Sequence, residues 1–238
     1  MMPSARTSKA AANALMIAPI LFAFCLSTTS VTAQERCFDT PVEVNGASEQ
    51  ELHLTCAAAK VALLMLGRCS IFVRRQLNIH ILREVKHPLG GQVFGLFDTG
   101  GERILVTQHA NVGPLIQGTP YSEIPTVEFY GSLVVHEVVH GVLHQHYGRQ
   151  PKSHAVYEYP AYAIQLESLS PSTRQKFLQS STQATTARQG FLFTDTILLF
   201  DPYFFAARSY QHFKSSVDGC AHLRALLEGD VDFVVTAP

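Results

Sequence analysis

The sequence has few charged residues, and they are spread along the chain. Charged residues make up 16% of 238, the formal net charge is −1, and no run of like charge occurs. Binding of nucleic acid or of an anionic membrane needs clustered basic side chains, so we expect neither partner. The chain also has no internal repeat, no long low-complexity linker and no CxxC pair. The last absence argues against a zinc site built from thiolates.

Beyond its first 33 residues the chain has no apolar run long enough to cross a membrane. The most apolar later stretch, residues 133–143, contains His136 and Glu137, and it is shorter than the roughly 20 residues that a spanning helix needs. We therefore expect no stable membrane insertion of the mature chain.

Residues 1–33 have the pattern of a secretory signal. Arg6 and Lys9 precede the apolar stretch Ala11–Leu26, and Val31-Thr32-Ala33 offers small residues for cleavage after Ala33. This predicts an exported protein, periplasmic or extracellular, with an uncleaved membrane anchor as the alternative. Residues 34–238 are enough for one domain, which we expect to comprise an N-terminal lobe over 34–150 and a helical lobe over 151–238.

The four cysteines of residues 34–238 predict two disulfides, because exported proteins rarely keep free thiols. Leu52, Cys56, Ala59, Leu63 and Leu66 form a stripe that predicts a helix over Glu49–Leu66. Such a helix holds Cys56 too far from Cys69 for a bond. Two pairings remain: Cys37–Cys56 with Cys69–Cys220, or Cys37–Cys69 with Cys56–Cys220.

Between the helix Glu49–Leu66 and residue 110 we expect strands, and after residue 110 the chain is expected to be mostly helical. The predicted strands are Ile71–Val85, Gln92–Phe97 and Arg103–Gln108, the last two joined by a hairpin turn at Asp98-Thr99-Gly100-Gly101. Later helices are predicted over Glu158–Leu169, after Ser170-Pro171, over Phe191–Phe213 with a break near Pro202, and over Gly219–Leu227. Val231–Val235 could return as a strand, and Gly113–Pro125 and Gln179–Gly190 look irregular.

His136-Glu137-Val138-Val139-His140 is the most informative segment of the chain. Its apolar flanks predict a helix, with Thr126 as N-cap and a stop near Gly148. Residues four apart lie on one helical face, so both imidazoles can bind one zinc ion, while Glu137 can reach the water that the ion activates. A buried helix with hydrogen-bonded histidines is the structural alternative, but unpaired imidazoles are costly to bury.

On this motif and the element order, residues 70–215 resemble the zincin metallopeptidases. The resemblance implies an α+β fold, with an N-terminal mixed sheet and helices, a C-terminal helical lobe, and the motif helix between them. Zincins bind extended substrate along an edge strand, and Arg103–Gln108 is the candidate here.

The third zinc ligand is expected to be Glu158, since gluzincins take this ligand as a glutamate from the next helix. Pro160 suggests that Glu158 lies in or just before the first turn of that helix. His146 has the spacing of the HExxHxxGxxH pattern, but Leu143 stands where that pattern needs glycine, and no methionine follows the motif. Glu167 ranks last.

Two further roles follow from the gluzincin resemblance. Thermolysin-like members hold a zinc histidine with an aspartate four residues after the third ligand, where this chain has Tyr162, so Asp195, Asp201 or Gln165 could serve instead. A downstream Tyr or His stabilises the oxyanion in that group, and here Tyr210 is preferred to His212.

The predicted activity is hydrolysis of a peptide or protein substrate by one bound zinc ion, with Glu137 as general base. The alternative is not an enzyme: a zincin-fold module that binds zinc but does not cleave peptides, and acts as an inhibitor, sensor or binding protein of the cell envelope. A chance motif in an exported helical domain is the third reading.

Overall fold

A five-stranded mixed sheet forms one side of the fold in the computed structural model, which describes residues 35–147, 153–182 and 193–229. β2, β3 and β7 are parallel, and the outer strands β1 and β6 are antiparallel to their neighbours. In order across the sheet, the strands are β1 (Glu35–Arg36), β2 (Val42–Asn45), β3 (Leu77–Leu82), β7 (Arg103–Thr107) and β6 (Gly95–Asp98). β4 (Val85–Lys86) and β5 (Gln92–Val93) form a separate pair.

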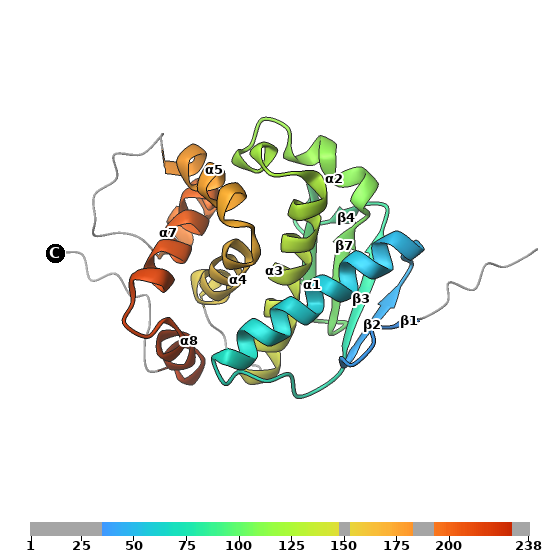
Figure 1. The fold of residues 1–238 in the computed structure, drawn as a ribbon, viewed down its shortest axis with the longest axis horizontal. Helices are drawn as coiled ribbons and strands as arrows, with labels where there is room; N and C mark the ends of the chain where they lie inside the picture. The colour runs from blue at the N-terminus through green and yellow to red at the C-terminus, as the bar shows by residue number, and fades with distance from the viewer. Residues whose placement is uncertain (1–34, 148–152, 183–192, 230–238) are drawn as a thin grey trace, which may run out of the picture. The chain divides into compact units, whose positions relative to one another are not determined.

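Helices make up most of the rest, so the fold class is α+β, as expected. They are α1 (Glu49–Arg68), α2 (His109–Ile116), the 3₁₀ helix η1 (Pro120–Glu123), α3 (Thr126–Tyr147), α4 (His154–Ser168), α5 (Pro171–Thr182), α6 (Asp195–Phe200), α7 (Pro202–Ser215) and α8 (Gly219–Glu228). In Figure 1, α1 and the sheet lie on one side of α3, and the later helices lie on the other. α3 packs on α1, α4, β6 and β7. None of the helices in the described ranges has the length and apolar character of a membrane span.

Strands form within all three predicted segments, although Gln92–Phe97 falls on two strands, β5 and β6, in different sheets. The edge of the five-stranded sheet is not where the sequence placed it. β3 buries Leu77, Ile79 and Ile81 on one face, which gives the expected alternation over a shorter range than Ile71–Val85. The predicted edge strand Arg103–Gln108 is wrong in its position, because β7 pairs with β3 on one side and β6 on the other. The edge strand next to α3 is therefore β6.

The hairpin turn between β6 and β7 is confirmed. The strands pair from Gly95↔Val106 to Asp98↔Arg103, and Asp98 Oδ1 accepts hydrogen bonds from the backbone N–H groups of Gly100 and Gly101. This side-chain turn is the reason why the Asp-Thr-Gly-Gly sequence predicts the reversal.

Two disulfides join Cys37 to Cys56 and Cys69 to Cys220. This is one of the two pairings that the sequence allowed. Cys56 lies within α1, which begins with a capping box between Ser48 and Glu51. The second disulfide ties the C-terminal end of α1 to α8, the last helix of the described chain.

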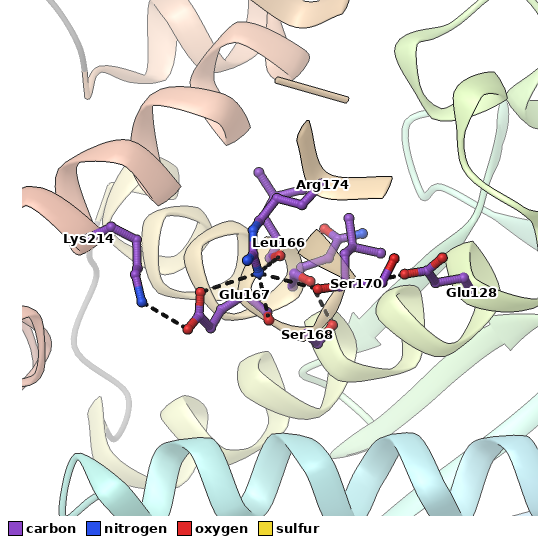
Figure 2. Close-up of polar contacts among 9 residues, drawn as sticks. Glu128, Leu166, Glu167, Ser168, Ser170, Arg174 and Lys214 are labelled. Atoms are coloured by element: carbon purple, nitrogen blue, oxygen red, sulfur yellow. Dashed lines mark hydrogen bonds and ion pairs between the residues drawn. The ribbon is translucent and has the colours of Figure 1, made fainter. Parts of the chain in front are cut away.

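Polar side chains fix the junction between α4 and α5 against α3 (Figure 2). One guanidinium nitrogen of Arg174 donates to the carbonyls of Leu166, Glu167 and Leu169 at 3.1–3.3 Å, which satisfies the end of α4. Glu128, in the first turn of α3, accepts from the backbone N–H of Ser170 at 2.6 Å. These contacts hold α4 in place beside α3.

Some of the other predicted helix and loop boundaries agree with the structure, and some do not. The break at Pro202 separates α6 from α7, as predicted. Thr126 is the first residue of α3, not its N-cap, and α2 and η1 occupy part of the stretch that was predicted to be irregular. The signal over residues 1–33 and the strand Val231–Val235 lie outside the described residues.

Candidate metal centre

The motif lies on the buried helix α3, where His136, Glu137 and His140 line a cavity. His136 and His140 are one turn apart, and their Nε2 atoms are 3.0 Å from each other. α3 is buried on almost all sides, because it packs between the sheet and α4. Gly141 permits this packing on the sheet side, since a Cβ there would lie 3.1 Å from the side chains of Leu77 and Ile104.

Glu158 reaches the same point from α4. This helix begins at His154, so Glu158 lies at the start of its second turn, not in or just before the first turn as Pro160 had suggested. Pro160 is accommodated inside the helix although it cannot donate to the carbonyl of Val156. The hydroxyl of Tyr147 lies 3.4 Å from that carbonyl.

Ligand atoms of three residues converge at distances close to those that a zinc ion requires. Glu158 Oε2 lies 3.3 Å from His136 Nε2, and Glu158 Oε1 lies 3.4 Å from His140 Nε2. Two atoms bound at about 2.0–2.1 Å to one tetrahedral zinc ion lie about 3.3–3.4 Å apart. The group could therefore hold a metal ion, and its donor set of two imidazoles and a carboxylate is typical of catalytic zinc.

Gln165 orients the first histidine. Its Oε1 lies 3.0 Å from His136 Nδ1, so the Nδ1–H donates to the amide and Nε2 is left to bind a metal. Asp195 and Asp201, the other candidates for this role, cap the starts of α4 and α7. Tyr162, where thermolysin-like enzymes have aspartate, packs its ring edge against His136 with centroids 4.7 Å apart.

Burial and neighbouring charges give the two glutamates different acidities. Burial raises the pKa of the Glu137 carboxyl, partly offset by the charges of His136 and His140. Burial opposes ionisation of Glu158 too, but the neighbouring imidazoles of His140 and His136 outweigh it and lower its pKa far below the usual range. Glu158 is thus a carboxylate suited to ligation, while Glu137 is the better proton acceptor.

The site opens into a cavity of about 520 Å³ between β6, α3, α4 and the start of α7. Imidazoles and carboxylates form one part of its lining, and aromatic rings form another. Phe94 packs edge-on against Phe129 at 5.2 Å, and Tyr121 against Tyr203 at 5.4 Å. The aromatic lining consists of Phe94, Phe97, Tyr121, Phe129, Tyr157, Tyr162 and Tyr203.

The structure does not bring Tyr210 to this cavity. Its ring packs under the guanidinium of Arg174, 5.1 Å from the centroid, and Tyr210 is absent from the cavity lining. His212, the alternative to Tyr210, bonds the hydroxyl of Tyr159. The position of Tyr210 on the interior side of α7, toward α5, gives no support to its predicted role at the oxyanion.

The rival third ligands also point elsewhere. His146 Nε2 lies 2.8 Å from the carbonyl oxygen of Phe72, in the segment between α1 and β3. Glu167 pairs with Arg174 and Lys214, as Figure 2 shows. Neither residue lines the cavity.

Tyr162 and Tyr203 are cavity residues whose role the sequence did not indicate. Tyr162 could have been found from its spacing, because Glu158, Tyr162 and Gln165 follow one another at i, i+4 and i+7 on one face of α4. Burial raises the pKa of the Tyr162 hydroxyl well above its usual range, and the negative charge of Glu158 adds to this effect. Tyr162 therefore stays a neutral donor. Tyr203 comes from a distant helix, and only the tertiary fold places it here.

The chain belongs to a family of unknown function (DUF6639), which residues 42–236 match. No curated protein and no solved structure matches the sequence. The match covers the five residues of the motif, the helix that carries Glu158 and the edge strand β6.

Proposed function

We propose that this protein is a zinc-dependent peptidase of the zincin type, similar to the gluzincins. The observation that carries the proposal is the convergence of His136, His140 and Glu158, whose ligand atoms all lie within 4.8 Å of one another, with the buried Glu137 carboxylate beside them. A structural zinc site has no use for such a carboxylate, because its coordination is closed by protein ligands.

Each residue has a distinct task in the proposed reaction. His136, His140 and Glu158 hold the zinc ion, which when bound supplies a Lewis acid that activates water and polarises a carbonyl. Glu137 accepts the proton of the attacking water and returns it to the leaving amine. Tyr162 and Tyr203, which line the cavity, replace Tyr210 as candidate donors to the developing oxyanion.

The cavity supports a peptide or protein substrate with an apolar side chain near the scissile bond. Aromatic rings form a large part of its lining, and such surfaces favour apolar groups. β6 lies at the edge of the sheet and lines the same cavity. An extended substrate could add to this strand through backbone hydrogen bonds, which transfers to β6 the role that the sequence had given to β7.

We also propose that the protein acts outside the cytoplasm. The disulfides Cys37–Cys56 and Cys69–Cys220 support this, since such bonds persist in oxidising compartments. Peptide substrates would then be exported or extracellular proteins.

Proteolysis of an unfolded protein substrate tests the proposed activity, with Glu137→Gln as the decisive variant. The amide keeps the shape of the side chain but cannot take a proton, so we expect turnover to fall by at least about 10²-fold while zinc remains bound. Treatment with a chelator should abolish activity, and added zinc should restore it. Cleavage at an unchanged rate by Glu137→Gln would refute the mechanism, and zinc binding without any cleavage would favour the non-catalytic module.

A further inference from the structure

Gly95 is the first residue of the edge strand β6, and no feature of its backbone requires glycine. It pairs with Val106 in the ladder, and it is not one of the glycines with positive φ. Glycine weakens a strand because it adds conformational entropy to the unfolded chain and packs no side chain. Within strands it often marks a place where another group approaches closely.

The group that approaches Gly95 is the carboxylate of Glu137. A Cβ atom placed on Gly95 would lie 2.6 Å from Glu137 Oε1 and 2.8 Å from both Cδ and Cγ. These distances are far below van der Waals contact, so the acid occupies the volume that any other residue at position 95 would fill. Gly131, on the same helix as Glu137, has no atom within 4 Å of its corresponding position.

Hydrogen bonds do little to hold this carboxylate. Glu137 Oε2 is buried and has no hydrogen-bond partner within the described part of the chain. The side chain is 5% exposed, so its orientation depends on the surfaces that enclose it. One of those surfaces is the bare backbone of β6 at Gly95, which also lines the cavity.

We propose that Gly95 is a positioning residue, whose missing side chain lets the general base lie between α3 and the edge strand. The inference rests on the proposed peptidase function. A side chain at position 95 would push the Glu137 carboxylate away from strand β6, because the three atoms nearest to the added Cβ all belong to Glu137. We expect His136, His140 and Glu158 to keep their places. Gly95→Ala should therefore impair proton transfer and leave metal binding intact.

The kinetic test compares Gly95→Ala with the matched control Gly131→Ala. Misplacing a catalytic group by about 1 Å can cost about 10²-fold in rate. We expect Gly95→Ala to lower kcat by about that factor, with KM within about twofold and an unchanged zinc content. Gly131→Ala should match the wild type in all three. Wild-type kcat in Gly95→Ala would overturn the proposal, as would a loss of zinc that parallels the loss of kcat.

A second experiment, based on thermal unfolding, does not require enzymatic activity. It covers the case in which Gly95→Ala folds poorly. In the wild-type background Gly95→Ala should lower Tm by at least about 3 °C, because the added methyl meets Glu137. In the Glu137→Ala background the space is free, so the same change should leave Tm unchanged or raise it. Equal Tm changes in both backgrounds would contradict the proposal that Glu137 occupies the space beside Gly95. An inactive wild type that still shows this coupling would instead refute the peptidase function, and the positioning role with it.

Discussion

At the scale of single residues, the hydrogen bonds of each side chain determine which of its atoms remain available to bind a metal ion. His136 uses Nδ1 for Gln165, so its Nε2 faces Glu158 and His140. The five-residue motif predicted both imidazoles and the neighbouring acid, because helical spacing alone brings them to one face. Gln165 was one of three candidates for the partner of a zinc histidine, and only the packing of α4 on α3 shows that it, not Asp195 or Asp201, bonds His136.

Gln165→Ala should weaken zinc binding without removing a ligand. The His136 Nδ1–H would lose its acceptor, and the ring would be free to turn away from the metal. Substitution of such partners typically costs 10–100-fold in metal affinity, so we expect the zinc Kd to rise by about that range. Competition with a chromogenic chelator measures it.

Gln145→Ala is the control for this prediction, since Gln145 bonds the backbone of Arg74 and Arg75 at the far end of α3. It should leave the zinc Kd unchanged. Equal affinities of Gln165→Ala and the wild type would show that packing alone orients His136.

At the scale of elements, local patterns predicted which segments are helices and strands but not how they are ordered in space. Glu49–Arg68 and the β6–β7 hairpin follow from an apolar stripe and a glycine-containing turn. Sheet order depends on non-local pairing, so the sequence did not reveal that β7 is interior and β6 is at the edge. The sequence could not place Tyr210 relative to the cavity for the same reason, because its direction depends on how α7 packs against α4 and α5.

Glu128→Gln should loosen the start of α5 in a pH-dependent way. Burial acts to raise the pKa of Glu128, but the backbone N–H of Ser170 and the hydroxyl of Thr173 outweigh it, and the pKa lies below its ordinary value of 4.5. A lowered folded-state pKa contributes stability above the unfolded value and loses it as pH falls through the folded one. We expect Glu128→Gln to cost about 1 kcal/mol at pH 7, as loss of a helix cap does.

Urea unfolding at pH 7 and at pH values below 4.5 measures this effect. The free-energy difference between the wild type and Glu128→Gln should shrink as the pH falls. A difference that stays constant, or grows in acid, would contradict the assignment of the contact. Glu123→Gln serves as control, because Glu123 is an exposed residue at the end of η1.

At the scale of the whole molecule, two covalent links close loops of very different length. Cys37–Cys56 spans 19 residues, whereas Cys69–Cys220 spans 151 and joins α1 to α8 around the elements that carry the site. The sequence reduced the pairing to two arrangements through the length of α1, and only the packing of α8 against α1 and α3 decides between them. In an exported protein both bonds would persist during function.

Removing Cys69–Cys220 by paired alanine substitution should destabilise the protein more than removing Cys37–Cys56. A disulfide acts mainly by lowering the entropy of the unfolded chain, and this effect grows with loop length. We expect losses of about 5 kcal/mol and about 3 kcal/mol respectively. Guanidinium unfolding of the two double variants measures the difference, and a larger loss from the shorter loop would contradict this explanation.

The most direct test of the account is the zinc content of the purified protein, compared between the wild type, Glu158→Ala and His146→Ala. We predict one zinc ion per wild-type chain, the same content in His146→Ala, and loss of most zinc in Glu158→Ala. Zinc retained in Glu158→Ala and lost in His146→Ala would reverse the choice of third ligand. A wild-type chain that binds no zinc under any loading condition would contradict the metal centre itself.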